Sequence, residues 1–161
     1  MGEKLVVYFS ASGVTKGVAE KVAKAADADI FEIEPVEKYT DADLDWTNLK
    51  SRTTIEMKDK KDSFRPPIAN EVENIDKYDT LIIGFPIWWY IAPTIINTFL
   101  ESYDLDGKKI VLFATSGSSG MGNTMSELES SAKGAEFVAE KRLESTISQE
   151  DVNSWIESLN L

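Results

Sequence analysis

Residues 4–15 read KLVVYFSASGVT, a nearly unbroken apolar run that passes without a spacer into hydroxyl-bearing residues and a glycine. The run Lys4–Phe9 lacks the alternation of a strand with one solvated face, so we predict a strand buried on both faces. The segment that follows, to about Ala26, has apolar residues at helical spacing, namely Val18, Val22 and Ala25. This stretch therefore predicts the first strand and helix of an α/β fold.

The alternation of strand-like and helix-like segments continues to the end of the chain. We predict further strands at Ile30–Ile33, Thr80–Phe85, Lys109–Ala114 and between Glu136 and Leu143. We predict helices at about 41–46, 70–74, 124–132 and 149–159, and one from Pro93, as its first residue, to about Tyr103. The fold class is accordingly an α/β three-layer open sandwich, whose five-stranded parallel sheet has the order 2-1-3-4-5 with helices on both faces.

Length and composition limit the kinds of chemistry that the chain can perform. Its 161 residues, 42% of them hydrophobic, suit a single domain over residues 1–161. The chain has no cysteine and no histidine, which excludes thiolate nucleophiles, Cys/His zinc sites and Ser/His/Asp triads. We therefore expect no metal site, no catalytic side chains of its own, and chemistry supplied by a bound cofactor.

Charge and hydropathy bear on location and partners. No apolar run approaches the roughly 20 residues that span a bilayer, so we expect a cytoplasmic protein without membrane insertion. The net charge of −11 disfavours nucleic acid and favours encounters with basic proteins at low ionic strength. A purely solubilising role for this charge is the alternative.

The hydroxyl-rich turn after the first strand is the first candidate binding loop. In an open α/β sheet, ligands bind beyond the carboxyl ends of the strands where the strand order reverses. The turn there consists of Ser10, Ala11, Ser12, Gly13, Val14 and Thr15. Its hydroxyls, its glycine and the amides of a helix start would wrap a phosphate. An ordinary N-cap needs only Ser12 or Thr15, so hydroxyls at alternate positions favour the phosphate cradle.

Two further loops follow the third and fourth predicted strands. The second loop runs from 86 to 93 and holds three adjacent aromatic residues, Trp88, Trp89 and Tyr90, beside Pro86 and Ile87. At least one of these rings is expected to face a flat ligand, although Trp88 and Trp89 could instead pack over the next helix. The third loop has small residues that let backbone donors approach a heteroaromatic edge, or that form a flexible linker: Thr115, Ser116, Gly117, Ser118, Ser119, Gly120, Met121 and Gly122.

Together these segments resemble the flavodoxin family, whose phosphate loop reads T/S-x-T/S-G-x-T, matched here by Ser10, Ser12, Gly13 and Thr15. The resemblance implies a flavodoxin-like fold of the short-chain type that binds FMN. Residues 10–15 would bind its phosphate, residues 86–90 would cover a flavin face and edge, and residues 115–122 would contact the pyrimidine end. It further implies an electron carrier between a reductase and acceptor proteins, which we expect to have basic docking surfaces. We expect a low potential, because an acidic surround and a desolvated pyrimidine end disfavour the anionic hydroquinone. A monomer is favoured, with a dimer as the alternative.

Two departures from the family pattern leave alternatives open. Residues 87–91 contain no glycine, whereas many flavodoxins have one in this loop. The stretch Phe85–Pro93 is also similar to the corresponding loop of flavodoxin-fold NAD(P)H:quinone reductases, which implies an NAD(P)H-dependent quinone or nitro-type oxidoreductase and usually a dimer. A non-redox flavin-binding module is the third alternative.

Overall fold

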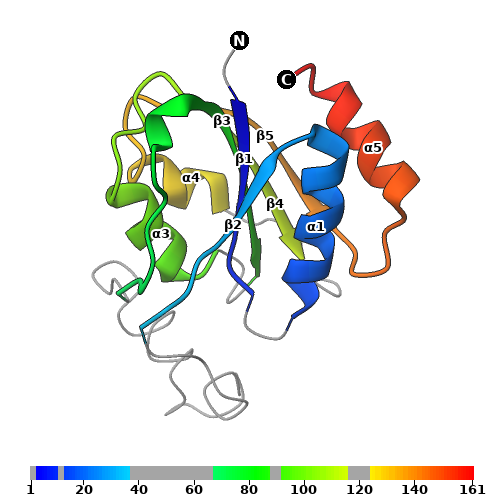
Figure 1. Ribbon diagram of the computed structural model, residues 1–161, viewed down its shortest axis with the longest axis horizontal. Helices are drawn as coiled ribbons and strands as arrows, with labels where there is room; N and C mark the ends of the chain where they lie inside the picture. The colour runs from blue at the N-terminus through cyan, green and yellow to red at the C-terminus, as the bar shows by residue number, and fades with distance from the viewer. Residues whose placement is uncertain (1–2, 11–12, 37–66, 88–91, 116–123) are drawn as a thin grey trace.

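The computed structural model describes residues 3–10, 13–36, 67–87, 92–115 and 124–161. Its strands form one parallel sheet of the order β2-β1-β3-β4-β5, as Figure 1 shows. The strands are β1 (Glu3–Tyr8), β2 (Asp29–Glu32), β3 (Tyr78–Pro86), β4 (Lys109–Thr115) and β5 (Glu136–Leu143). This arrangement confirms the α/β class and the strand order expected from the sequence.

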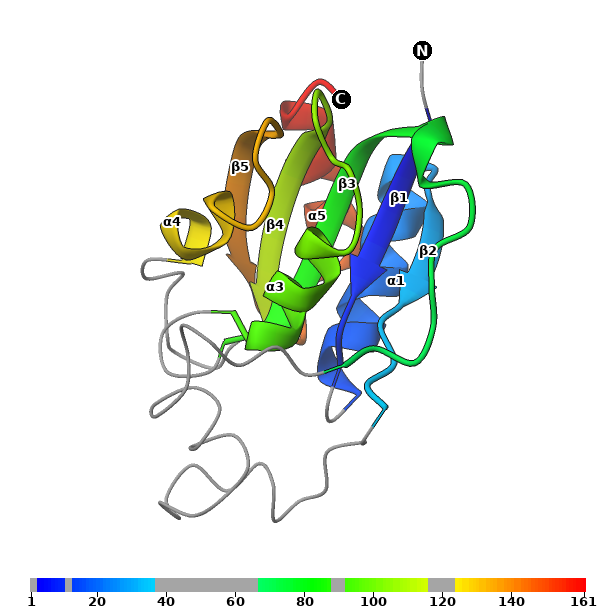
Figure 2. The ribbon, with the colours of Figure 1, turned by 90° about the vertical axis from the view of Figure 1, so that its left-hand side faces the viewer.

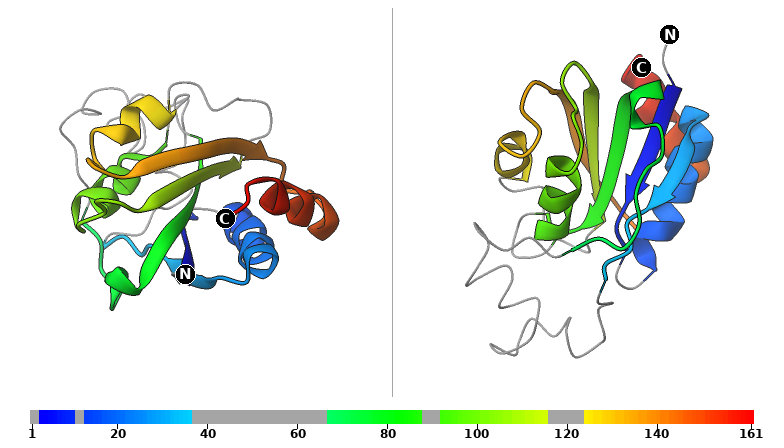
Figure 3. Two further views of the ribbon diagram at one scale, coloured as in Figure 1. Left: turned by 90° about the horizontal axis from the view of Figure 1, so that it is seen from above. Right: turned by 60° about the vertical axis from the view of Figure 1, so that its left-hand side comes forward.

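Helices cover both faces of this sheet. Figure 2 and the end-on view in Figure 3 show α1 (Val14–Ala26) and α5 (Gln149–Ser158) on one face, with α3 (Thr94–Glu101) and α4 (Thr124–Glu129) on the other. The molecule is therefore the three-layer sandwich that the alternation of segments predicts. Among the described residues, no helix has the length and apolar character needed to cross a membrane.

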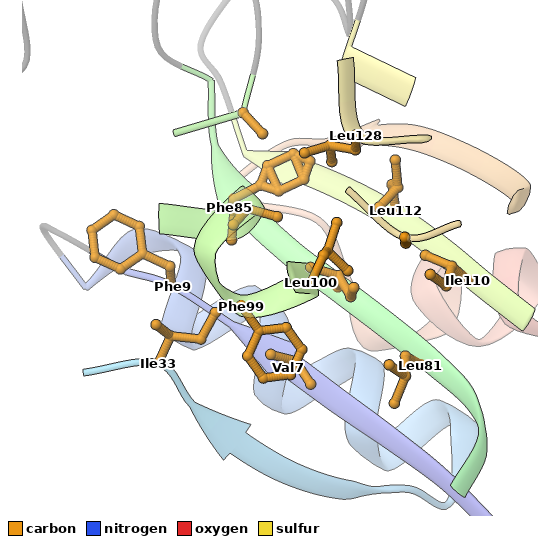
Figure 4. Packing of buried hydrophobic residues seen from close by; sticks show 14 of the residues in the cluster. Val7, Phe9, Ile33, Leu81, Phe85, Phe99, Leu100, Ile110, Leu112 and Leu128 are labelled. Atoms are coloured by element: carbon orange, nitrogen blue, oxygen red, sulfur yellow. The ribbon is translucent and has the colours of Figure 1, made fainter. Parts of the chain in front are cut away.

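The central strands are apolar on both sides because each side packs under helices. In β1, Leu5 and Val7 belong to the apolar cluster beneath α3 and α4, while Val6 and Tyr8 belong to the cluster beneath α1 and α5. Successive side chains of a strand point to opposite faces, so a strand buried on both sides has no polar positions to alternate with. Figure 4 shows the first cluster, in which Phe99 of α3 lies over the strands.

Gly84 brings the ends of β3 and β4 close together. It pairs in register with Phe113 of β4. A Cβ on Gly84 would lie 2.0 Å from the Cζ of Phe113, so the phenylalanine ring occupies the place of the missing side chain. This close approach holds the carboxyl ends of the two central strands in position.

The structure corrects one predicted helix. The brief helix expected at 70–74 is absent, and a single 3₁₀ turn at Ile75–Lys77 follows instead. The Asn70 side chain accepts from the Glu34 amide and donates to the Glu32 carbonyl, and the Val72 amide donates to the Tyr103 hydroxyl. These tertiary bonds hold the Asn70 side chain and the Val72 amide in a non-helical conformation, next to the isolated antiparallel bridge between Pro35 and Ile68. The short helix expected at 41–46 lies outside the described residues.

The other differences are at the ends of elements. Pro93 precedes α3 as an extended cap residue, with φ −57° and ψ 145°, and is not its first helical residue. α3 ends at Glu101 and α4 at Glu129, two and three residues before the predicted ends. At the end of α3 the Ser102 hydroxyl donates to the Thr98 carbonyl at 2.6 Å, and such a side-chain bond competes with continuation of the helix.

Candidate functional site

The described parts of the three candidate loops lie at the carboxyl ends of β1, β3 and β4, which point to the same edge of the parallel sheet (Figure 1). The predicted site residues within them are Ser10, Gly13, Val14, Thr15, Pro86, Ile87 and Thr115. The remaining predicted site residues lie outside the described residues: Ala11, Ser12, Trp88, Trp89, Tyr90, Ser116, Gly117, Ser118, Gly120, Met121 and Gly122.

The first loop closes on itself through a glycine in the left-handed region. Gly13 has φ 92° and ψ −12°, and its amide donates to the Ser10 Oγ at 3.0 Å. A Cβ on Gly13 would meet no atom within 4 Å. The need for glycine here is therefore conformational and not steric, because residues with a side chain rarely adopt this φ.

This turn leads into a helix whose N-terminus suits an anion. The first four amides of any helix lack intrahelical partners and carry the positive end of its dipole. α1 has no acidic residue in its first turn, and its cap residue Gly13 has no side chain to bond those amides. Val14, in the same turn, is 45% exposed. The first turn of α1 itself therefore presents no negative side chain to an anion such as a phosphate monoester.

A hydroxyl pair joins the first loop to the third. The Oγ1 atoms of Thr15 and Thr115 are 2.7 Å apart, in a hydrogen bond between residues 100 positions apart in the sequence. Both threonines are buried, with 2% and 5% of their surface exposed. The bond fixes the first turn of α1 to the end of β4.

Thr115 also contacts the second loop. Its carbonyl oxygen accepts a hydrogen bond from the Ile87 amide at 3.3 Å. On the other side, the Phe9 amide donates to the Gly84 carbonyl at 3.0 Å, which ties the end of β1 to β3. The described parts of all three candidate loops thus meet at Thr115, one of the residues that the sequence singles out for binding.

The entry to α3 is apolar except for one hydroxyl. Ala92, Pro93 and Thr94 are buried, and Ile87 packs against the cluster beneath α3 and α4. The Thr94 Oγ1 is buried and has no hydrogen-bond partner among the described residues. Nothing in the sequence identifies this hydroxyl, because its burial depends on how α3 packs on the sheet.

Acidic side chains surround the end of β1. Burial, and after it the carboxylates of Glu32 and Glu20, together raise the pKa of Tyr8 to about 12. The carboxylate of Glu34, beyond the end of β2, also raises this pKa. The surroundings of this edge are therefore electronegative, while the described residues contain no group of three or more acidic side chains that could hold a metal ion.

Comparisons with known proteins agree with this geometry. The flavodoxin family model matches residues 3–159. A Bacteroides uniformis protein assigned as a flavoprotein is 46% identical with a TM-score of 0.91, over 97% of this chain and 98% of that one. A Bacteroides eggerthii protein with the same assignment is 40% identical with a TM-score of 0.89, over 100% and 99%.

A more distant structure shares the fold. The flavoprotein from Lactobacillus acidophilus, solved in complex with FMN, is 23% identical with a TM-score of 0.73, over 96% of this chain and 99% of that one. No curated protein matches the chain.

Proposed function

The chain belongs to the flavodoxin family, and from this membership we propose that it binds one FMN at the carboxyl edge of its sheet and carries electrons at low potential. The observation that carries the proposal is the start of α1. There a left-handed glycine precedes a first helical turn that contains a buried threonine hydroxyl and no acidic residue. The structurally similar flavoprotein from Lactobacillus acidophilus, described with FMN, supports the choice of flavin.

The described residues fit a flavin phosphate. Ser10, before the turn at Gly13, and Thr15, after it, offer hydroxyl groups, and the first amides of α1 offer donors. Ser10 accepts the Gly13 amide through its oxygen, so the hydroxyl proton is not used in that bond. When bound, FMN supplies the redox chemistry that the side chains of this chain lack. The residues from 86 to 90 and from 115 to 122 would hold its ring.

The electrostatics favour a low potential. The net charge is −11, and Glu20, Glu32 and Glu34 surround the buried end of β1. Added negative charge on a ligand beside these carboxylates is disfavoured, which makes the reduced ligand a stronger reductant. We propose a reductase and acceptor proteins with basic docking surfaces as partners, which a monomer of this charge would attract at low ionic strength.

Binding and potential test the proposal separately. FMN added to refolded, cofactor-free protein is expected to bind one-to-one at micromolar concentration or below, measured by quenching of flavin fluorescence. Redox titration of the complex should then place the second electron couple below that of free FMN. Absence of binding contradicts the cofactor, and a second couple at or above that of free FMN contradicts the low-potential carrier.

The enzymatic alternative rests on the similarity of residues 85–93 to the quinone-reductase loop. An NAD(P)H-dependent oxidoreductase would accept hydride directly, so rapid mixing of the FMN complex with NADPH separates the two functions. A carrier should stay oxidised until its reductase is added. Reduction by NADPH alone, within seconds, would favour the oxidoreductase.

A further inference from the structure

We propose that Thr115 is a positioning residue for phosphate recognition, which acts through Thr15 and makes the site prefer a phosphorylated flavin to the same flavin without phosphate. The inference rests on the proposed function and extends it. The family resemblance implies that residues 115–122 contact the pyrimidine end of the ring. Within the structure, the Thr115 hydroxyl lies 2.7 Å from that of Thr15, in the first turn of α1.

The chemistry of the hydroxyl pair determines which of the two threonines donates the hydrogen bond. Each threonine hydroxyl has one proton and can also accept, so only one of the two donates across the 2.7 Å contact. If Thr15 donates to a phosphate oxygen, its own oxygen must accept from Thr115. A bound phosphate therefore selects the arrangement in which Thr115 donates to Thr15 and Thr15 donates to the anion.

Two hydroxyls in series strengthen the bond to the anion. A hydrogen bond to a charged acceptor polarises the donor, and a second donor behind it increases that effect. Both threonines are buried, at 2% and 5% exposure, so water does not readily replace Thr115 if its hydroxyl is removed. The contribution of Thr115 should appear only with a ligand that carries the phosphate.

The backbone of Thr115 serves a different loop. Its carbonyl accepts from the Ile87 amide at 3.3 Å, where the loop expected to cover the flavin ring begins. Replacement of Thr115 by valine removes the hydroxyl and keeps that carbonyl, and valine retains the β-branched shape that suits the end of a strand. The substitution therefore separates recognition of the phosphate from support of the ring loop.

The experiment compares FMN with riboflavin. Dissociation constants are measured by flavin fluorescence quenching for the wild type, Thr115→Val, Thr115→Ser and Thr80→Val. Thr80 is the matched control: it is a buried threonine on β3, at the opposite end of the sheet, and its hydroxyl donates to Asp79. All variants are first compared with the wild type by circular dichroism and thermal unfolding.

Thr115→Val should weaken FMN binding about fivefold to tenfold, the effect expected for one hydrogen bond in a charge-assisted chain. Riboflavin binding should change by less than about twofold, because riboflavin has no phosphate for Thr15 to reach. Thr115→Ser should retain FMN affinity, and Thr80→Val should affect neither flavin. If valine prevents folding, Thr115→Ala removes the same hydroxyl and should show the same selectivity.

Three results would overturn the inference. They are an equal loss for FMN and riboflavin in Thr115→Val, an unchanged FMN affinity in that variant, and a serine variant as weak as the valine variant. A double variant of Thr15→Val and Thr115→Val should bind FMN about as weakly as Thr15→Val alone, since both act through one bond. A wild-type protein that binds neither flavin contradicts the proposed function itself, which is a distinguishable outcome.

Discussion

α1 and α5 pack side by side on one face of the sheet (Figure 3), and α5 begins beside Lys21 of α1, yet their N-termini are built differently. α5 starts at Ser148, whose Oγ accepts from the Asp151 amide at 3.1 Å. Glu150 and Asp151 add two carboxylates to its first turn. α1 starts at Gly13, with no acidic residue in its first turn.

The difference separates a helix whose first turn is capped by its own side chains from one whose described residues provide no such cap. A capping hydroxyl and nearby carboxylates occupy orphan amides and neutralise the helix dipole, which stabilises the isolated protein but repels an anion. α1 lacks this stabilisation. Its N-terminus lies where the strand order reverses, and the Thr115 hydroxyl is hydrogen-bonded to Thr15 in its first turn. The two helix ends therefore differ in capping chemistry as well as in position, and substitutions at each end test whether the uncapped end binds the anion.

The largest expected effect comes from giving α1 the acidic first turn of α5. Val14→Glu places a carboxylate at a position that is 45% exposed, so folding should be preserved. Repulsion between this carboxylate and the flavin phosphate should weaken FMN binding about 100-fold. Val14→Gln, of the same size without the charge, is the control. Equal affinities for the two variants would show that the phosphate does not bind near this turn.

The left-handed turn provides the second test. Gly13→Ala should destabilise the flavin-free protein by about 1–2 kcal/mol, because alanine is strained at φ 92°. Gly17→Ala, four residues later within α1, should stabilise the protein by up to about 1 kcal/mol, because alanine is the better helix former. Urea unfolding measures both. Shifts in the same direction would contradict the conformational role of Gly13.

Removal of the α5 cap is the complementary experiment. Ser148→Ala should cost about 1 kcal/mol of unfolding free energy, through loss of the bond to the Asp151 amide. FMN affinity should not change, because α5 begins beside Lys21 and not at the turn around Gly13, and its first turn carries two carboxylates. Thermal unfolding and a flavin titration of the same sample measure the two quantities. A clear loss of FMN affinity would mean that α5 supports the site after all.

The smallest effect concerns the ionisation of Tyr8, close to Glu20 of α1, and it appears only at alkaline pH. Burial first, and then Glu32 and Glu20, raise the pKa of Tyr8 from 10.0 to about 12 in the folded protein. The unfolded chain therefore releases this proton at lower pH than the folded one. Stability from this group is complete below pH 10 and falls as the pH rises towards 12. In Tyr8→Phe this part of the loss of stability above pH 10 should disappear. Unfolding temperatures measured at each pH test this expectation.

Much of the fold could be predicted because its signals are local. The run Lys4–Phe9 is apolar at every position except its first. Such a pattern indicates a strand between two helical layers, and its residues do divide between the two apolar clusters. The predicted helix at 70–74 is wrong for the opposite reason. The bonds of Asn70 and Val72 are made with β2 and with Tyr103, at distances in sequence that no local pattern reveals.

The sequence by itself determined the layered fold, the family resemblance and the hydroxyl-glycine turn, since burial periodicity and the backbone freedom of glycine are properties of neighbouring residues. Only the tertiary structure decided that Thr15 pairs with Thr115, that the Ile87 amide bonds to the same residue, and that Phe113 fills the place beside Gly84. These contacts arise where parallel strands, separated by long crossovers, end at one edge. The packing of the sheet determines which residues pair there, and the spacing of residues in the sequence does not reveal these pairs.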